Sequence, residues 1–278
     1  MKRLQIFLYW LTLSISIYTS AAIAQELPIG AEAAGMGHAA INLKGRAGVF
    51  ANPAGLAYTR SAEILAGVEN RFGLGEGLLG LNAAYLHRLS KATLGLSVYR
   101  FGDEFFSTHQ LGLNFSQQIN QFCFGLRLRQ HQYSGEGIDT HFATAIDVGG
   151  IFLISRQLNA GMLIRNINQG SYSHGFQDQL PTSLEAGLSF LPDERLSLHS
   201  SLFYELDERP MLRLGVDYHP LQKLHFRSGF NTGVYPLYFF GLGLSHTLLQ
   251  FDYAIEWHNM LGLSHQLGLV YKLPQHEK

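Results

Sequence analysis

The chain has 278 residues, of which only 15% are charged, and its formal net charge is -1. Ordinary soluble domains carry about 25% charged residues, and proteins that bind nucleic acid are strongly basic. The composition therefore excludes a nucleic-acid partner and argues against a soluble enzyme. The 30 glycines and 12% aromatic residues are typical of a protein wall between lipid and a narrow lumen.

The first residues predict an export signal. Met1, Lys2 and Arg3 make a basic start, residues 4–18 are apolar and uncharged, and Ala24 ends a small-residue cleavage site. This is the pattern of a secretory signal peptide, so we predict that residues 1–24 are removed. The alternative is an uncleaved anchor helix. The apolar run is short for that role, because a spanning helix needs about 20 apolar residues.

A segment rich in small residues lies between the signal and the first strand. It contains Gly35, Met36 and Gly37, and later an Asn-Pro-Ala motif at residues 52–54. Small residues let backbones approach closely, and an Asn-Pro pair favours a turn. We therefore predict that residues 25–61 form a compact plug inside a barrel. The alternative is a disordered leader, since chain termini are often disordered.

Apolar and polar residues alternate through most of residues 62–273. Between Leu212 and Tyr218, for example, every second residue is a large hydrophobe. Strict alternation predicts a strand with one apolar and one polar face. The predicted strands are residues 64–72, 78–87, 93–101, 105–119, 122–133, 142–154, 159–167, 182–190, 196–206, 211–219, 224–230, 237–245, 250–258 and 263–273.

These segments predict an all-β fold, a transmembrane antiparallel β-barrel of about fourteen strands with an N-terminal plug segment. The barrel is expected in the outer membrane of a Gram-negative bacterium, followed by a short tail at residues 274–278. All eight prolines are expected outside the strands, because proline cannot donate to a ladder. A soluble sandwich is the alternative, but its outer face should be polar, whereas one face of each segment here is nearly pure hydrocarbon.

Two motifs of the small-residue segment, Gly35-Met36-Gly37 and Asn52-Pro53-Ala54, resemble those of the PorV/PorQ group of outer-membrane proteins. More distantly, the chain resembles the long-chain fatty acid transporter (FadL-like) family. It has His38 where the PorV/PorQ group usually has a further glycine. The resemblance to PorV/PorQ implies a non-enzymatic component that binds a protein partner in secretion or in the envelope. The FadL-like alternative implies passive transport of hydrophobic small molecules, and we rank it second.

By strand alternation, charged side chains of both signs point into the lumen. Near-balanced opposite charges predict paired networks that pack against the plug, because buried charges need partners. The alternative is that each charge is solvated. A general porin would need a wider, water-filled channel. The predicted inward set is Arg127, Arg129, Asp147, Arg165, Glu185, Glu205, Arg213, Asp217, Arg227, Asp252 and Glu256.

The chain offers little sign of catalysis or cofactor binding. Ser107 and His109 share a strand face, as a nucleophile and base would, but no orienting carboxylate or amide is evident. We therefore predict no enzymatic activity. The 13 histidines show no metal-ligand spacing, so we predict neither a metal site nor a cofactor. The expected partners are outer-membrane lipid and either a secretion-system or cargo protein or a hydrophobic small molecule.

Overall fold

The computed structural model describes residues 30–73, 79–173, 180–206, 208–233 and 235–274. The predicted signal peptide, residues 1–24, lies outside the described residues, as do residues 25–29 of the predicted plug and 275–278 of the predicted tail. Among the described residues, no helix is long and apolar enough to cross a membrane.

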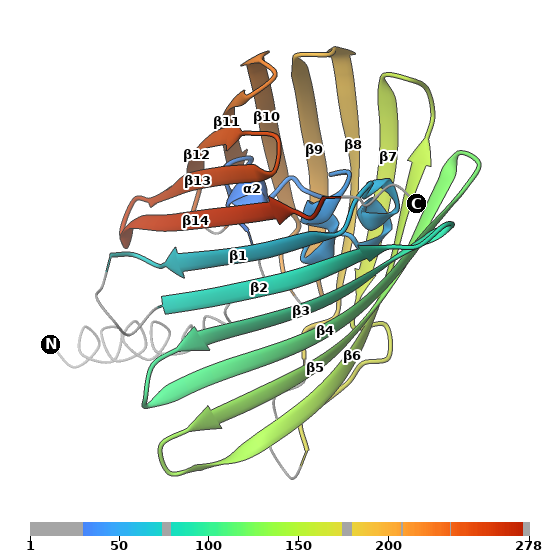
Figure 1. Cartoon of the computed structure of the whole chain (residues 1–278). Coiled ribbons are helices and arrows are strands. Elements are labelled where there is room, and N and C mark those ends of the chain that lie inside the picture. Colours follow the sequence, from blue (N-terminus) through green and yellow to red (C-terminus); the bar gives the residue numbers. More distant parts are fainter. Residues whose placement is uncertain (1–29, 74–78, 174–179, 207, 234, 275–278) are drawn as a thin grey trace, which may run out of the picture.

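The described strands form one closed antiparallel barrel (Figure 1). Each strand pairs with its neighbours in sequence, and β1 pairs with β14 to close the wall. This confirms the predicted all-β barrel of about fourteen strands. The strands are β1 Glu63–Asn70, β2 Leu79–Arg88, β3 Ala92–Gly102, β4 Phe106–Ile119, β5 Phe122–Gly135, β6 Ile138–Leu153, β7 Leu158–Arg165, β8 Ser183–Asp193, β9 Leu196–Glu205, β10 Met211–Leu221, β11 Leu224–Asn231, β12 Leu237–Ser245, β13 Leu249–His258 and β14 Gly262–Lys272.

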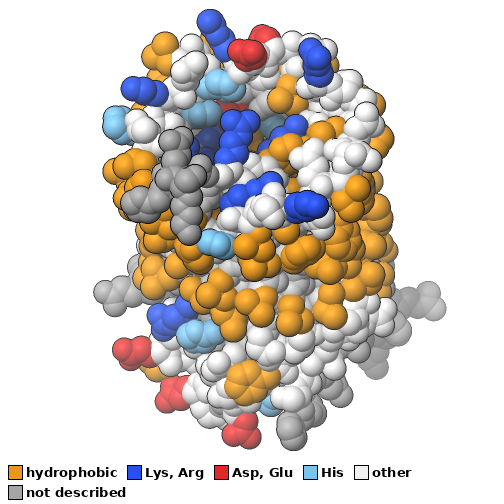
Figure 2. All heavy atoms as spheres, turned by 45° about the vertical axis from the view of Figure 1, so that its right-hand side comes forward, with side chains coloured by type: hydrophobic (Ala, Val, Ile, Leu, Met, Phe, Trp, Pro, Cys, Tyr) orange, Lys and Arg blue, Asp and Glu red, His pale blue; other side chains and the backbone are white. Residues whose placement is uncertain are grey.

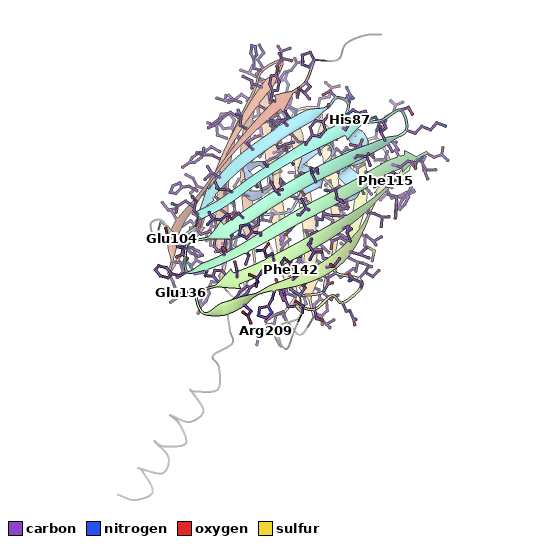
Figure 3. The ribbon with its side chains drawn as sticks, turned by 60° about the horizontal axis from the view of Figure 1, so that its bottom comes forward. His87, Glu104, Phe115, Glu136, Phe142 and Arg209 are labelled. Carbon is purple, nitrogen blue, oxygen red and sulfur yellow. The ribbon has the colours of Figure 1, made fainter. Side chains whose placement is uncertain are left out.

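The two faces of the wall differ as the alternation predicts. On β10, Leu214 is 41% exposed while its neighbour Arg213 is fully buried. Figure 2 shows a band of hydrophobic side chains around the side of the barrel, with charged side chains towards both ends. Figure 3 shows side chains such as Phe115 and Phe142, both exposed, projecting from the wall. An outward apolar band of this kind is what a lipid-facing wall requires.

The structure corrects the prediction that all prolines lie outside the strands. Pro192 lies in β8 and Pro220 in β10. In both strands the pairing register shifts at the proline, between Phe190 and Asp193 with β9 and between Tyr218 and Leu221 with β11. A residue without an N–H donor is tolerated where a bulge interrupts the ladder. Alternation along one strand does not reveal such a bulge, because it depends on the partner strand.

The N-terminal segment, residues 30–59, runs across the inside of the barrel. It contains helix α2 (Ala31–Ala34) and two 3-10 helices, η1 (Arg46–Val49) and η2 (Pro53–Tyr58). Helix α2 contacts β12, β13 and β14, whereas η2 contacts β3 to β6. Most side chains of the segment are buried. Much of the buried apolar core of the molecule, such as Met36, Val49 and Leu56, therefore belongs to this segment.

Candidate functional site

Three pairs of glycines line the inner wall where the N-terminal segment lies against it. The members of each pair stand directly opposite one another on neighbouring strands, so each pair removes two side chains from one place. Backbones can approach closely only where such side chains are absent. The pairs are Gly125 and Gly149 on β5 and β6, Gly161 and Gly187 on β7 and β8, and Gly215 and Gly229 on β10 and β11.

Each glycine pair receives a different part of the N-terminal segment. A Cβ atom on the β10–β11 pair would collide with Met36 and Gly37. On the β7–β8 pair it would meet residues 41–42, and on the β5–β6 pair residues 52–54. Gly35 packs in the same way against Gly241 of β12. The residues of both predicted plug motifs therefore lie at the places where the segment and the wall come closest.

Asn52 joins the segment to itself and to the wall. Its side chain is fully buried, and its Oδ1 accepts a hydrogen bond of 3.1 Å from the N–H of Ala54. Its Nδ2 donates to the carbonyl of Ile41 at 2.9 Å. The same nitrogen lies 3.3 Å and 3.4 Å from the carbonyls of Gly150 and Met162, on β6 and β7. One amide thus connects the start of η2, the preceding loop and two strands.

We expect Asn52→Ala to loosen the segment without unfolding the barrel. The change leaves the Ala54 N–H and the Ile41 carbonyl without partners, at about 1–3 kcal/mol for each buried group. The docked segment should therefore lose about 2–6 kcal/mol, and its amides should exchange faster in hydrogen–deuterium exchange.

A matched control for this variant is Asn168→Ala. Asn168 is exposed and also makes two backbone hydrogen bonds, to Thr144 and Ile146, both on β6. It should leave exchange of the N-terminal segment unchanged. Equal exchange of residues 36–56 in the Asn52→Ala variant and the parent chain would contradict the role given to Asn52.

Asp147 is the centre of the first charged group in the lumen. Its fully buried carboxylate lies 2.7 Å from Arg127 Nε and 2.8 Å from Arg129 Nε, and it also accepts the N–H of Asn166 at 3.0 Å. Arg127 also donates to the carbonyl of Phe50 at 2.7 Å. Arg127 thus links the carboxylate of Asp147 on the strand wall to the N-terminal segment.

Glu185 is the centre of a second charged group. Its Oε2 lies 3.2 Å from Arg165 Nη1 and 3.2 Å from Arg213 Nη1, and its Oε1 accepts from the hydroxyl of Ser201 at 2.8 Å. The guanidinium of Arg213 also lies over the ring of Phe203, 4.1 Å from its centroid. Both guanidinium groups of this buried cluster therefore have an ionic partner.

Arg227 holds the third group together. Its guanidinium lies 2.6 Å from Asp252 Oδ1, 3.4 Å from Asp217 Oδ2 and 4.0 Å from Glu32 of α2. Glu32 also pairs with Arg46 of η1 at 3.2 Å. Burial opposes ionisation of Glu32, but Arg46 and Arg227 together hold the pKa of its carboxyl below its usual value. The N-terminal segment is therefore tied electrostatically to β11.

The two remaining predicted charges have different neighbours. Glu256 on β13 lies 3.9 Å from Nε2 of His38, and Glu205 on β9 interacts electrostatically with Arg213. His38 has a φ of +60°, a left-handed conformation that glycine adopts most readily. Its ring packs edge-on against Phe239, with 5.3 Å between centroids. The left-handed turn at this position is thus occupied by a buried ring that packs against the wall.

A hollow of about 530 Å³ lies at the wall formed by β2 to β6. One row of residues that pair across neighbouring strands runs through this hollow. The polar residues of the row are flanked at each end by an exposed hydrophobic residue. Exposed Val98 and Leu111 lie beside this row. The hollow therefore combines an apolar rim with a polar centre. The row is Leu81, Arg100, His109, Gln132 and Phe142.

Ser107, considered above together with His109, has a different close neighbour. Its hydroxyl oxygen lies 3.1 Å from the hydroxyl of Ser134 on β5. His109 is part of the hollow's lining instead. The structure thus gives the Ser107 hydroxyl a hydroxyl partner on the neighbouring strand.

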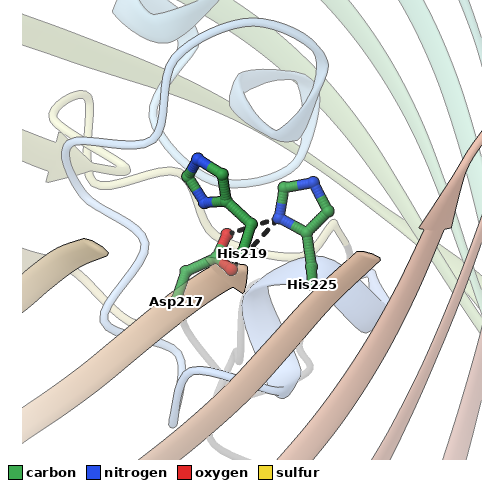
Figure 4. A group of neighbouring side chains, drawn as sticks. All are labelled: Asp217, His219 and His225. Atoms are coloured by element: carbon green, nitrogen blue, oxygen red, sulfur yellow. Dashed lines mark hydrogen bonds and ion pairs between the residues drawn. The ribbon is translucent and has the colours of Figure 1, made fainter. Parts of the chain in front are cut away.

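The structure brings together three side chains whose grouping was not predicted, Asp217, His219 and His225. Their ligand-type atoms all lie within 4.8 Å of one another (Figure 4). Asp217 and His219 are two residues apart on β10, so they share a face, and His225 follows across a short turn on β11. An Asp-x-His pair ahead of a hairpin turn was the available signal. Histidine spacing along a single segment does not reveal the cluster, because His225 lies on a different strand from His219.

No protein-family model and no curated protein sequence matches the chain. Solved structures do match. They include the Pseudomonas putida toluene transporter TodX, with a TM-score of 0.62, 12% identity, and 88% of this chain and 97% of that chain covered. They also include a Pseudomonas aeruginosa FadL homologue, with a TM-score of 0.63, 12% identity, and 87% and 98% covered. At these identities the likeness shows a shared β-barrel fold.

Proposed function

We propose that this barrel passes small hydrophobic molecules across the outer membrane, with residues 30–59 acting as a plug. The observation that carries the proposal is the wall hollow, whose rim of exposed hydrophobes opens on the apolar side of the barrel. Molecules that partition into lipid reach such a rim directly. The fold-level likeness to proteins described as a toluene transporter and a FadL homologue supports the same class of cargo.

The backbone and side chains inside the barrel argue against a wide channel for ions or sugars. The N-terminal segment lies against wall glycines on β5 to β12, and buried ion pairs centred on Asp147, Glu185 and Arg227 occupy the space beside it. A water-filled pore needs free lumen, which wider barrels provide. A plugged barrel whose wall carries a hollow with an apolar rim is better suited to hydrophobic cargo than to hydrated cargo.

The motif resemblance ranked partner binding above hydrophobic transport, and we propose the reverse order. The resemblance to PorV/PorQ favoured a partner-binding role, whereas the matched structures include ones described as a toluene transporter, a monoaromatic hydrocarbon channel and a FadL homologue. Charge substitutions in the loop of residues 168–179 would test partner binding, and residues 174–179 of that loop lie outside the described residues. The hydrophobic cargo is therefore the better supported of the two functions.

Uptake by cells that express the barrel tests the proposal. We expect Leu111→Trp to fill the hollow and lower the rate of uptake several-fold. Radiolabelled toluene and radiolabelled oleate serve as separate probes, so that a monoaromatic cargo and a long-chain cargo are distinguished. The matched control is Leu113→Trp, since Leu113 is also exposed on β4 but does not line the hollow.

Two results would contradict the proposal. The first is equal uptake of both probes by cells with the parent barrel and cells with an empty vector. That result would return the partner-binding role to first place. The second is an equal loss of uptake in both tryptophan variants at normal barrel abundance, because the hollow would then have no specific part in passage.

A further inference from the structure

The β10–β11 hairpin carries a cluster of three metal-ligating side chains on the inner face of the wall. It lies at the end of the barrel where short turns join the strands. Nδ1 of His225 is 3.1 Å and 3.2 Å from the two carboxylate oxygens of Asp217. The rings of His219 and His225 are tilted towards each other, with 5.0 Å between centroids (Figure 4). All three residues thus turn polar atoms towards one small volume.

One atom of the cluster lacks a hydrogen-bond partner among the described residues. Nδ1 of His219 is buried, and no hydrogen bond reaches it. A buried polar atom without a partner costs about 1–3 kcal/mol. A cation bound between the rings and the carboxylate would satisfy this nitrogen, because neutral imidazole nitrogen and ionised carboxylate oxygen are both good ligands for Zn²⁺.

The charged neighbours of the cluster are compatible with a bound cation. Arg227 lies 3.4 Å from Asp217, but its closest ionic partner is Asp252 at 2.6 Å. Asp217 can therefore turn towards a metal without leaving Arg227 unpaired. His199 is the other histidine nearby, and both of its ring nitrogens are already within hydrogen-bond distance of Ser189 and Ser197. The ligand set is thus limited to the three residues of the hairpin.

We infer that Asp217, His219 and His225 bind one divalent transition-metal ion, such as Zn²⁺, at the mouth of the lumen. Two histidines and one carboxylate leave a fourth position for water in tetrahedral geometry. The side chains of His225 and Asp217 keep 20% and 14% of their surface exposed, so an ion has access from solvent. The site lies on the hairpin and is separate from the wall hollow on β2 to β6.

Calorimetric titration of the purified, untagged barrel in detergent with ZnCl₂ tests this site. We expect one saturable ion per chain in the parent protein. His219→Ala, His225→Ala and Asp217→Asn should each weaken binding at least about tenfold, since even residues that only support metal ligands contribute that much. The matched control is His246→Ala, which removes an exposed histidine from a turn at the same end of the barrel.

Cobalt substitution provides a second measurement that does not depend on the variants folding. Co²⁺ bound by two imidazoles and a carboxylate should give visible absorption bands that ZnCl₂ removes by competition. Absence of saturable Zn²⁺ binding by the parent barrel would overturn the inference. An equal loss of affinity in His246→Ala would also overturn it, because binding would then reflect scattered surface histidines.

Discussion

We expect Gly229→Val to displace the proposed plug, residues 30–59, and to let ions pass through the lumen. An added Cβ would overlap the backbone of Met36 and Gly37, with the Gly37 Cα only 2.6 Å away. Real Cβ atoms essentially never approach other atoms so closely, and backbone cannot move aside as a flexible side chain can. The N-terminal segment should therefore move away from the two glycines of β10 and β11 against which it packs. Planar-bilayer recording should show stable current steps that the parent barrel lacks.

The control for this prediction is Ser228→Val. Ser228 is the preceding residue on β11, and it is exposed on the opposite face of the strand. It adds the same side chain to the same strand without touching the segment, so conductance should stay low. A large steady pore in the parent barrel, or unchanged conductance in a folded Gly229→Val barrel, would show that residues 30–59 do not close the lumen.

Asp147→Ala should cause the largest loss of stability among single changes in the lumen. The carboxylate is fully buried and is the shared ionic partner of Arg127 and Arg129. Removing one member of a buried ion pair costs about 3–5 kcal/mol, because it leaves uncompensated buried charge. The free energy of unfolding in urea, measured on the barrel in lipid vesicles, should fall by about this amount.

Two further variants distinguish the cost of an unpaired buried charge from the cost of lost packing. Asp193→Asn removes an exposed carboxylate from the end of β8, and it should change stability far less. The triple change Arg127→Met, Arg129→Met and Asp147→Leu removes the charges together, and it should recover part of the lost stability. If the triple variant is less stable than Asp147→Ala alone, unpaired charge is not the cause of the loss.

The wall of the barrel was predictable because its signal is local. Alternation along segments such as 212–218 reports directly which face of a strand meets lipid, since successive side chains point to opposite faces. The number of strands follows from counting those segments, and their order follows from antiparallel pairing between neighbours. The same local signal placed Asp147, Glu185 and Arg213 on the buried face. It failed at Pro192 and Pro220, where a bulge depends on the partner strand.

The contacts that make a candidate site depend on register, which no single segment of sequence contains. Gly215 faces Gly229, and both face Met36, only because the β10–β11 hairpin and the distant N-terminal segment meet at one height in the wall. The partner chosen by each inward charge has the same origin, as does the meeting of His219 with His225 across a turn. Local sequence patterns thus specify the strands, their faces and the buried charges. Which residues meet depends on the folded barrel, because pairing across strands and closure of the wall bring together atoms that local periodicity leaves unrelated.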